Sequence, residues 1–373
     1  MSSFNFADNI VRLRREKGIT QEQLAEFIGV TKAAVSKWEN RQSLPDILIL
    51  PELAAFFDIS IDTLLGYEPQ LSKEQIQKLY QELAAEFAEQ PFEEVMERSR
   101  ELARKYYSCY PFLFQIGCLW LNHFMLEPDP EGQKKILSDL SKLCDRVAEE
   151  CKEIRLCNDV VMLKAMTDLQ LGKAKEVVEN IAEMLDPCRL TTNGEGILIQ
   201  AYQMSSQQEK AKSYTQVSML LHLLGIVGGA GSYLAICQQD RASCETTIER
   251  MEVLFEIYQL ENLHPNAVMQ FYYQAALYYC SYGEVQKALD QLERYGACGK
   301  KLLAGELLLQ GDDYFDSVED WFDQLDLGRN APRHRKIVLE SFLQTLEYPA
   351  FEILKDEPEY HRILRSCADL NHS

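Results

Sequence analysis

The amino-acid sequence predicts an all-α protein in which a small N-terminal helical domain precedes a long array of helices. Sustained alternation of apolar and polar residues, the mark of β-strands, is absent along the 373 residues. Capping boxes start helices after Thr20 and after Ser72, each with Gln three residues later. Prolines recur from Pro91 to Pro358 at positions typical of turns between helices. We therefore expect a domain at residues 1–66, a linker at 67–72 and a helical domain at 73–373.

Two short helices near the N-terminus form the most specific pattern in the chain. The first begins at Gln21 and ends at Gly29, a residue suited to the left-handed position that terminates a helix. Its apolar stripe is predicted to comprise Leu24, Phe27 and Ile28. The second helix, residues 31–40, is capped by Thr31. Two short helices joined by a tight turn form a helix-turn-helix, whose second helix enters the major groove of DNA.

The second helix has two distinct faces at helical spacing. Ala34, Val35 and Trp38 fall within one inward arc. The opposite arc is polar and comprises Lys32, Ala33, Ser36, Lys37 and Asn40. Two lysines alone are typical of a solvated face, but the surrounding pattern favours a face that offers hydrogen-bond donors to base edges.

The run RLRREKGITQEQLAEFIGVTKAAVSKWENRQSLP, with its K-G-x-T-Q-x-x-L-A start and W-E-N ending, resembles the Xre family of lambdoid-repressor-like helix-turn-helix proteins. LPELAAFFDISIDTLLG, which follows, is similar to the fourth and fifth helices of that five-helix domain. The resemblance covers residues 5–66 and implies binding to a double-stranded DNA operator. A proline disrupts a helix interior, so the fourth helix is expected to begin near Pro51, with residues 46–50 irregular.

The resemblance also implies roles for individual residues. Arg14 and Glu39 match a buried ion pair that ties the first helix to the third. The predicted DNA-binding residues divide into backbone-contacting and base-reading positions. Backbone contacts are expected from Gln21, Asn40 and Arg41, and base contacts from Lys32, Ala33, Ser36 and Lys37, with Thr31 capping the helix that carries them.

The charge of the chain is unevenly distributed. The net charge is −20, yet residues 1–66 hold seven basic and nine acidic residues, a net −2, which leaves −18 for the remainder. Residues 12–41 carry a net +3, with seven basic and four acidic residues. Local charge at the contact face governs phosphate binding, so an acidic chain is compatible with DNA binding. We expect the C-terminal acidity to keep the helical array away from DNA.

The helical array contains weak internal repeats. Residues 271–295 resemble a tetratricopeptide helix pair with Gly283 at the turn, and this favours a tetratricopeptide-like α-solenoid with a concave face. Six residues are predicted to sit at the packing positions of that pair: Tyr272, Ala275, Ala276, Tyr279, Ala288 and Leu292. The repeat phase directs another six toward the concavity as candidate effector-binding residues: Asn193, Gln200, Gln203, Gln270, Tyr273 and Leu277. Each of these can also be an ordinary packing residue.

The order of the two domains resembles that of the peptide-pheromone-responsive regulators of Gram-positive bacteria. That resemblance implies a peptide or small-molecule effector. Because a single helix-turn-helix unit buries little DNA surface, we also expect a homodimer on a two-fold site. Those regulators use asparagines on the inner face, whereas glutamines are commoner here. Two other interpretations stay open: a protein-interaction scaffold localised to DNA, and a phage-type repressor without a ligand.

Several other functions are not expected. The uncharged stretch from Ser213 to Gln239 is interrupted by four glycines, which predict a turn between two buried helices and not a membrane span. The six histidines are scattered, and no HExxH, GxSxG or Walker loop occurs. Eleven cysteines without a CxxC pair are typical of reduced thiols. We therefore expect a cytoplasmic protein that is not an enzyme and holds no cofactor or metal.

One acidic run is expected to form a solvated helical face. Asp312, Asp316, Glu319 and Asp323 share one stripe at helical spacing. Cations that follow in the sequence, Arg333, Arg335 and Lys336, are its expected partners.

Overall fold

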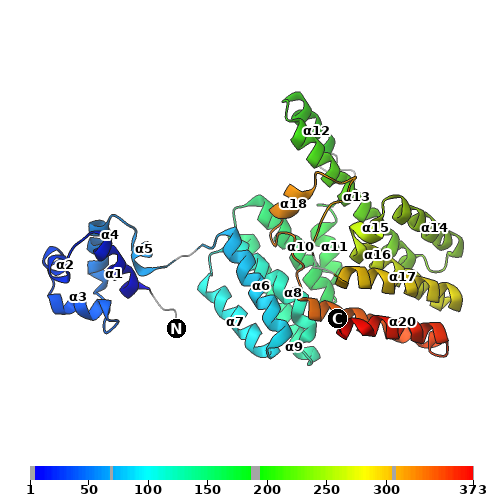
Figure 1. Ribbon diagram of the computed structural model, residues 1–373, viewed down its shortest axis with the longest axis horizontal. Coiled ribbons are helices and arrows are strands. Elements are labelled where there is room, and N and C mark those ends of the chain that lie inside the picture. The colour runs from blue at the N-terminus through cyan, green and yellow to red at the C-terminus, as the bar shows by residue number, and fades with distance from the viewer. Residues whose placement is uncertain (1–4, 68–69, 186–193, 305–307, 373) are drawn as a thin grey trace.

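The computed structural model describes residues 5–67, 70–185, 194–304 and 308–372. It confirms the all-α prediction, because the single extended pairing among these residues is an isolated antiparallel bridge between Leu308 and Asn330. Figure 1 shows a small N-terminal group of helices set apart from a larger array of antiparallel helices.

The N-terminal domain has the five predicted helices. They are α1 (Phe6–Glu16), α2 (Gln21–Ile28), α3 (Lys32–Glu39), α4 (Leu50–Phe57) and α5 (Ile61–Leu65). Pro51 lies in the first turn of α4, where its missing N–H costs no helical hydrogen bond, and a 3-10 turn at Ile47–Ile49 precedes it. The core of this domain draws its buried side chains from residues 6–64 alone, so these five helices have a hydrophobic core of their own.

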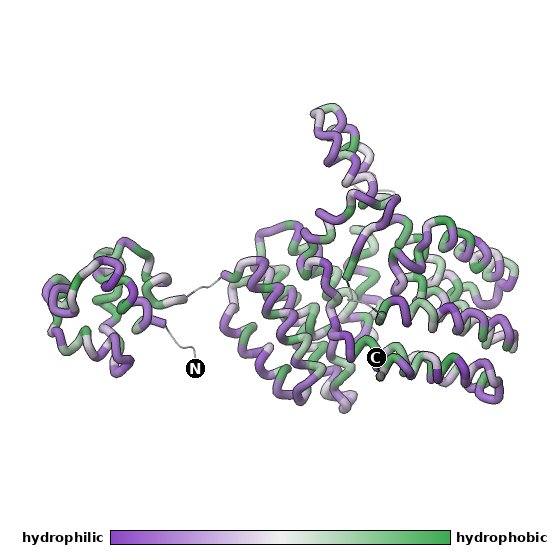
Figure 2. Tube along the Cα trace, in the orientation of Figure 1, coloured by the Kyte–Doolittle hydropathy of each residue, from purple (hydrophilic) through white to green (hydrophobic). Residues whose placement is uncertain are grey.

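The larger region consists of helices α6 to α20. Its first body contains α6 (Lys73–Glu89), α7 (Phe92–Lys105), α8 (Tyr110–His123), α9 (Pro130–Glu150), α10 (Ile154–Gln170) and α11 (Ala174–Ile181). The second contains α12 (Gly194–Met204), α13 (Gln208–Ile236), α14 (Arg241–Ile257), α15 (Leu260–Leu263), α16 (Pro265–Ser281), α17 (Val285–Ala304), α18 (Glu319–Gln324), α19 (Arg335–Leu346) and α20 (Pro358–Ala368). Short 3-10 turns lie at Phe124–Leu126, Pro349–Leu354 and Asp369–His372. Helices α7, α9, α17 and α20 carry hydrophobic and hydrophilic residues on different sides, and both kinds of residue occur throughout the array (Figure 2).

Two hydrophobic cores hold the larger region together. One is formed mainly by α6 to α10, and the other by α13 to α20. Ile337 of α19 belongs to the first core although it lies more than 160 residues after α10. Lys336 donates to the carbonyl of Ala88 at 3.1 Å, and Tyr80 donates to the carbonyl of Pro332 at 3.1 Å. The first turn of α19 and the residues just before it therefore connect the second body to the first.

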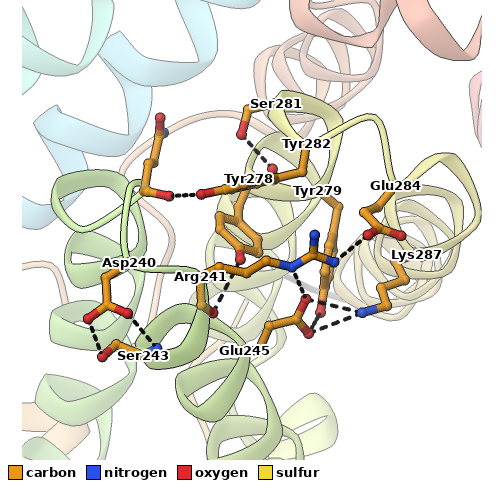
Figure 3. A network of polar contacts seen from close by, with 11 residues as sticks. Asp240, Arg241, Ser243, Glu245, Tyr278, Tyr279, Ser281, Tyr282, Glu284 and Lys287 are labelled. Atoms are coloured by element: carbon orange, nitrogen blue, oxygen red, sulfur yellow. Dashed lines mark hydrogen bonds and ion pairs between the residues drawn. The ribbon is translucent and has the colours of Figure 1, made fainter.

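The predicted helix pair at residues 271–295 is confirmed as α16 and α17. Gly283 adopts a left-handed φ of 69° at the turn between them. All six predicted packing residues are buried: Tyr272, Ala275, Ala276, Tyr279, Ala288 and Leu292. A polar network joins this pair to α14 (Figure 3), where the Glu245 carboxylate accepts from Lys287 at 3.1 Å and from the Tyr279 hydroxyl at 3.2 Å. Arg241 reaches Glu284 across the same network.

The glycine-rich turn expected between Ser213 and Gln239 is wrong. Helix α13 runs without interruption from Gln208 to Ile236 through all four glycines. One side packs on neighbouring helices through Val217, Leu220, Val227 and Leu234, and this packing outweighs the low helix propensity of glycine. By length and composition α13 could cross a membrane, and within the described ranges no other helix meets both criteria. Core helices of water-soluble proteins meet them too.

The acidic stripe is also corrected. Only Glu319 and Asp323 lie on a helix, α18, because Asp312 uses its carboxylate to cap the backbone N–H groups of residues 314 and 315. Asp316 contacts Lys212 at 2.8 Å, and this hydrogen bond lowers the pKa of Asp316 to about 2. Asp323 pairs with Arg329 at 2.6 Å. The expected partners Arg333, Arg335 and Lys336 do not pair with these carboxylates. The segment that carries the carboxylates instead contacts α13 through Asp316 and pairs with Arg329 through Asp323.

Candidate nucleic-acid interface

Helices α2 and α3 form the predicted helix-turn-helix. Thr20 and Gln23 form a complete capping box at the start of α2. Gly29 ends this helix at φ 76°, the left-handed conformation that the turn requires. Thr31 then caps α3, its side chain accepting from the backbone N–H of Ala34 at 3.2 Å. Four local signals in twelve residues thus fix the angle at which α3 leaves the turn.

The two faces of α3 lie as the sequence predicts. Val35 and Trp38 are buried in the domain core, and Ala34 packs against it. The opposite face is turned to solvent, with Ser36 half-buried at its edge. Its exposed members are Thr31, Lys32, Ala33, Lys37 and Asn40. This face presents two ammonium groups beside a hydroxyl and an amide, which suits contacts to phosphates and base edges.

A partly buried ion pair supports α3 from behind. The Arg14 guanidinium donates to both carboxylate oxygens of Glu39, at 2.5 and 3.0 Å, and 14% and 7% of the two side chains are exposed. Gln21 donates to the same carboxylate at 2.9 Å. Burial raises the pKa of Glu39, but the hydrogen bonds from Arg14 and Gln21 outweigh it and hold that pKa below its ordinary value. The pair therefore ties α1, α2 and α3 together.

Several candidate DNA-contacting side chains have partners inside the domain. The Gln21 amide donates one of its two hydrogens to Glu39, so the other can donate to a phosphate. Lys32 lies 3.4 Å from Glu22, and Asn40 donates to the carbonyl of Ser36 at 2.8 Å. Arg41 has a left-handed φ of 60° and pairs with Asp8 at 2.6 Å. Exposed pairs of this kind contribute little to stability, so these groups can exchange to phosphates at small cost.

The predicted apolar stripe of α2 is correct for Leu24 and Ile28, which are buried, but not for Phe27. The Phe27 side chain is 64% exposed and packs against Phe56 of α4, with ring centroids 4.2 Å apart and ring planes inclined by 46°. Lys17 lies over the Phe56 ring at 4.3 Å. Phe27 lies on the outer edge of the stripe, and a five-helix core of this size has no place for a third large side chain from α2.

The five candidate effector residues that the structure describes do not form one site. Gln200 and Gln203 are exposed on α12, which projects from the array in Figure 1, whereas Gln270, Tyr273 and Leu277 share one face of α16. Tyr273 packs among the rings of Tyr295, Tyr348 and Phe351, as an ordinary core aromatic does. Asn193 lies outside the described residues.

The comparisons with known proteins concern mainly the N-terminal domain. The helix-turn-helix family model matches residues 10–64. The chain is 41% identical over 63 residues to the transcriptional activator BcrR of Enterococcus faecalis, a match that covers 17% of this chain and 31% of BcrR. It is 33% identical over 95 residues to the transcriptional regulator SinR of Bacillus licheniformis, covering 24% of this chain and 86% of SinR.

These matches define a DNA-binding regulator of the helix-turn-helix type. The chain belongs to the family of helix-turn-helix transcriptional regulators, through its first 66 residues. A solved structure, the apo form of the competence regulator ComR from Streptococcus vestibularis, covers 87% of this chain and 98% of its own at 13% identity and a TM-score of 0.25. A likeness that distant carries no conclusion about the helical array.

Proposed function

We propose that the protein is a cytoplasmic, sequence-specific transcriptional regulator that binds its operator as a homodimer. Residues 1–66 bind DNA, residues 67–72 link the domains, and residues 73–373 form a tetratricopeptide-like array for dimerisation and effector sensing. The observation that carries the proposal is the exposed polar face of α3, held at a fixed angle by the Arg14–Glu39 pair. Neither a catalytic role nor a cofactor enters this proposal.

The proposed contacts are those that the resemblance to the Xre family implies, and the exposed face of α3 supports them. Lys32, Ala33, Ser36 and Lys37 face the bases of the major groove, whereas Gln21, Thr31, Asn40 and Arg41 contact the DNA backbone at its edges. One domain of this size covers little DNA surface. Two copies on a two-fold site, with half-sites about one helical turn apart, supply enough contacts for specific binding.

The homodimer is supported by the outward face of α13. Leu221, Ile226, Tyr233 and Ile236 are exposed along the side of this helix that faces away from its core contacts. No charged residue occurs from 213 to 239, although the chain as a whole carries −20. Two such chains repel each other over most of their surface, so this apolar face, beyond the point where the Glu195 carboxylate contacts Ser218 and His222, is where a second copy can approach.

Selection of bound fragments from the source genome by the purified protein tests this function. The Lys32→Ala/Lys37→Ala double variant is run alongside at about physiological salt. One palindromic motif recovered by the wild type alone supports a dimeric operator-binding regulator. Equal enrichment by both proteins contradicts the role of α3, and a motif without two-fold symmetry contradicts the dimer.

A further inference from the structure

A cavity of about 510 Å³ lies at the junction between the two bodies of the helical region. Asn122 contributes from the end of α8, and Asn266 and Gln270 from the start of α16. Ser341 and Thr345 line the opposite side from α19. The volume falls within the range of small-molecule sites in proteins, and polar groups from distant segments converge on it.

The floor of this cavity is apolar. Its members come from α15 to α17, from α19 and from the segment after residue 307, and they include Leu263, Met269, Leu309, Val338 and Phe342. A ligand that fits here therefore needs an apolar body as well as a polar group.

The charge of the lining is opposite to that of the chain. The chain has 58 acidic residues, yet every described residue that lines the cavity is basic or uncharged. The basic ones are Lys301, Arg329, Arg333 and His264. Lys301 is neutralised by Glu261 at 3.1 Å, and Arg329 by Asp323 at 2.6 Å. Arg333 is the remaining guanidinium, and in the described part of the chain no carboxylate lies within 4.0 Å of it.

Arg333 is also incompletely hydrogen-bonded. Its Nε is buried and has no partner. Burial lowers the pKa of Arg333 by more than the nearby Tyr80 hydroxyl raises it. Arg333 as a whole is half-buried. A partly desolvated cation without a counterion is costly to a fold, and an anionic ligand would supply the missing partner.

We infer that this cavity binds a small organic carboxylate, whose anionic end pairs with Arg333 and whose apolar body covers the floor between α16 and α19. A guanidinium binds a carboxylate through two parallel hydrogen bonds, which its two terminal nitrogens can donate. The lining joins Asn122 of the first body to α16 and α19 of the second, so an occupied cavity bridges the two bodies. This inference deepens the sensing role proposed above and rests on it for its effect on transcription.

A small free acid and the carboxyl terminus of a short apolar peptide both combine an anionic end with an apolar body, and one probe represents each. The first probe is 4-phenylbutyrate, with the amide of the same shape as its neutral control. The second is N-acetyl-trileucine with a free C-terminal carboxylate, with its C-terminal amide as control. For the smaller acid, with 12 non-hydrogen atoms, ordinary ligand efficiency predicts a dissociation constant of about 1–3 mM.

Titration calorimetry on the full-length protein without DNA is the test. We expect at least one acid to bind tenfold or more tightly than its amide, and Arg333→Met to abolish this difference while Arg333→Lys retains part of it. Arg294→Met, which removes a cation that pairs with Glu252 at 2.9 Å and does not line the cavity, should change the affinity less than threefold. If only one of the two acids binds, the result shows whether the ligand is a small free acid or the carboxyl terminus of a peptide.

Equal binding of acid and amide, or no binding of either acid, overturns the inference. The thermal unfolding temperature of ligand-free Arg333→Met gives a second readout. It should be unchanged or higher than that of the wild type, because an uncompensated buried charge is removed. A marked fall would mean that Arg333 supports the fold, and would overturn its assignment as a ligand contact. None of these outcomes alters DNA binding, so failure here is distinguishable from failure of the proposed regulator function.

Discussion

The N-terminal domain and the helical array differ in net charge and in where their cations lie. Residues 1–66 carry a net charge of only −2 and turn the lysines of α3 to solvent, where a polyanion can reach them. The remaining residues carry −18, yet they enclose a cavity whose described lining has no acidic residue. The comparison teaches that net charge says little about a site. The placement of a few cations, and whether each has a partner, decides which anions can bind.

The largest expected effect concerns what holds the DNA-binding face in place. Arg14→Ala leaves the Glu39 carboxylate buried without its main partner. We expect the free energy of unfolding of the N-terminal domain to fall by about 3 kcal/mol. Chemical denaturation followed by the fluorescence of Trp38, in a background where Trp120 and Trp321 are replaced by phenylalanine, measures it.

Arg12→Ala is the matched control for that experiment. Arg12 makes an exposed pair with Glu16 one turn away on the same helix, so its removal should cost no more than about 0.5 kcal/mol. Equal losses in the two variants would mean that the Arg14–Glu39 pair does not tie α1 to α3.

The second prediction asks whether the array, unlike the DNA-binding domain, is sensitive to mild acid. His123 is buried, stacks on Phe87 with ring centroids 4.5 Å apart, and burial lowers its pKa to about 4. Between pH 6.5 and 4 the unfolded chain binds a proton that the folded array does not, so stability falls as the pH falls. We expect a loss of about 2 kcal/mol between pH 7 and pH 5 from this group.

Urea denaturation of wild type and His123→Asn at the two pH values checks this sign. The variant is expected to be less stable at pH 7 but to lose less on acidification. His361→Asn, at an exposed histidine of the same region, should keep the wild-type pH dependence. An unchanged pH dependence in His123→Asn would show that this histidine is not buried in its neutral form.

The third prediction separates the face of α13 from other exposed apolar positions. Ile226→Asp places a charge on the proposed contact between two copies, and we expect the dimer dissociation constant to rise at least tenfold, about 1.4 kcal/mol. Ile154→Asp, at a 79% exposed isoleucine at the start of α10, should leave it unchanged. Sedimentation equilibrium measures both, and a dimer that survives Ile226→Asp uses another surface.

The smallest effect concerns the glycines of α13. A Cβ built at Gly225 or Gly229 meets no atom within 4 Å, so alanine fits in the single chain. Each change should stabilise the helix by up to about 1 kcal/mol where α13 stays exposed. Weaker dimerisation of Gly229→Ala, with a more stable isolated chain, would show that the second copy approaches the backbone here.

Sequence alone predicted the DNA-binding domain almost element by element, because its signals are local. Thr20, Gly29 and Thr31 each act within four residues, and the structure places them as expected. Phe27 was misplaced, since periodicity does not tell how many large side chains a small core can hold.

The helical array was predicted less well. The helix pair around Gly283 followed from local pattern, but the uninterrupted α13 depends on packing against α14 and α16 that no local signal reports. Asn122 and Arg333 are separated by more than 200 residues, and only the tertiary fold brings them to one cavity. The sequence did contain one hint, a run of three cations at residues 333–336 within an acidic chain.

The affinity of Lys37→Ala for the selected operator and for its single-base variants tests the central claim, that α3 reads DNA. We predict a loss of about 1–3 kcal/mol on the operator, with base preference relaxed at one position and retained elsewhere. A uniform loss across all sequences would make Lys37 a phosphate contact. Unchanged affinity and unchanged preference would contradict the assignment of α3 as the recognition helix.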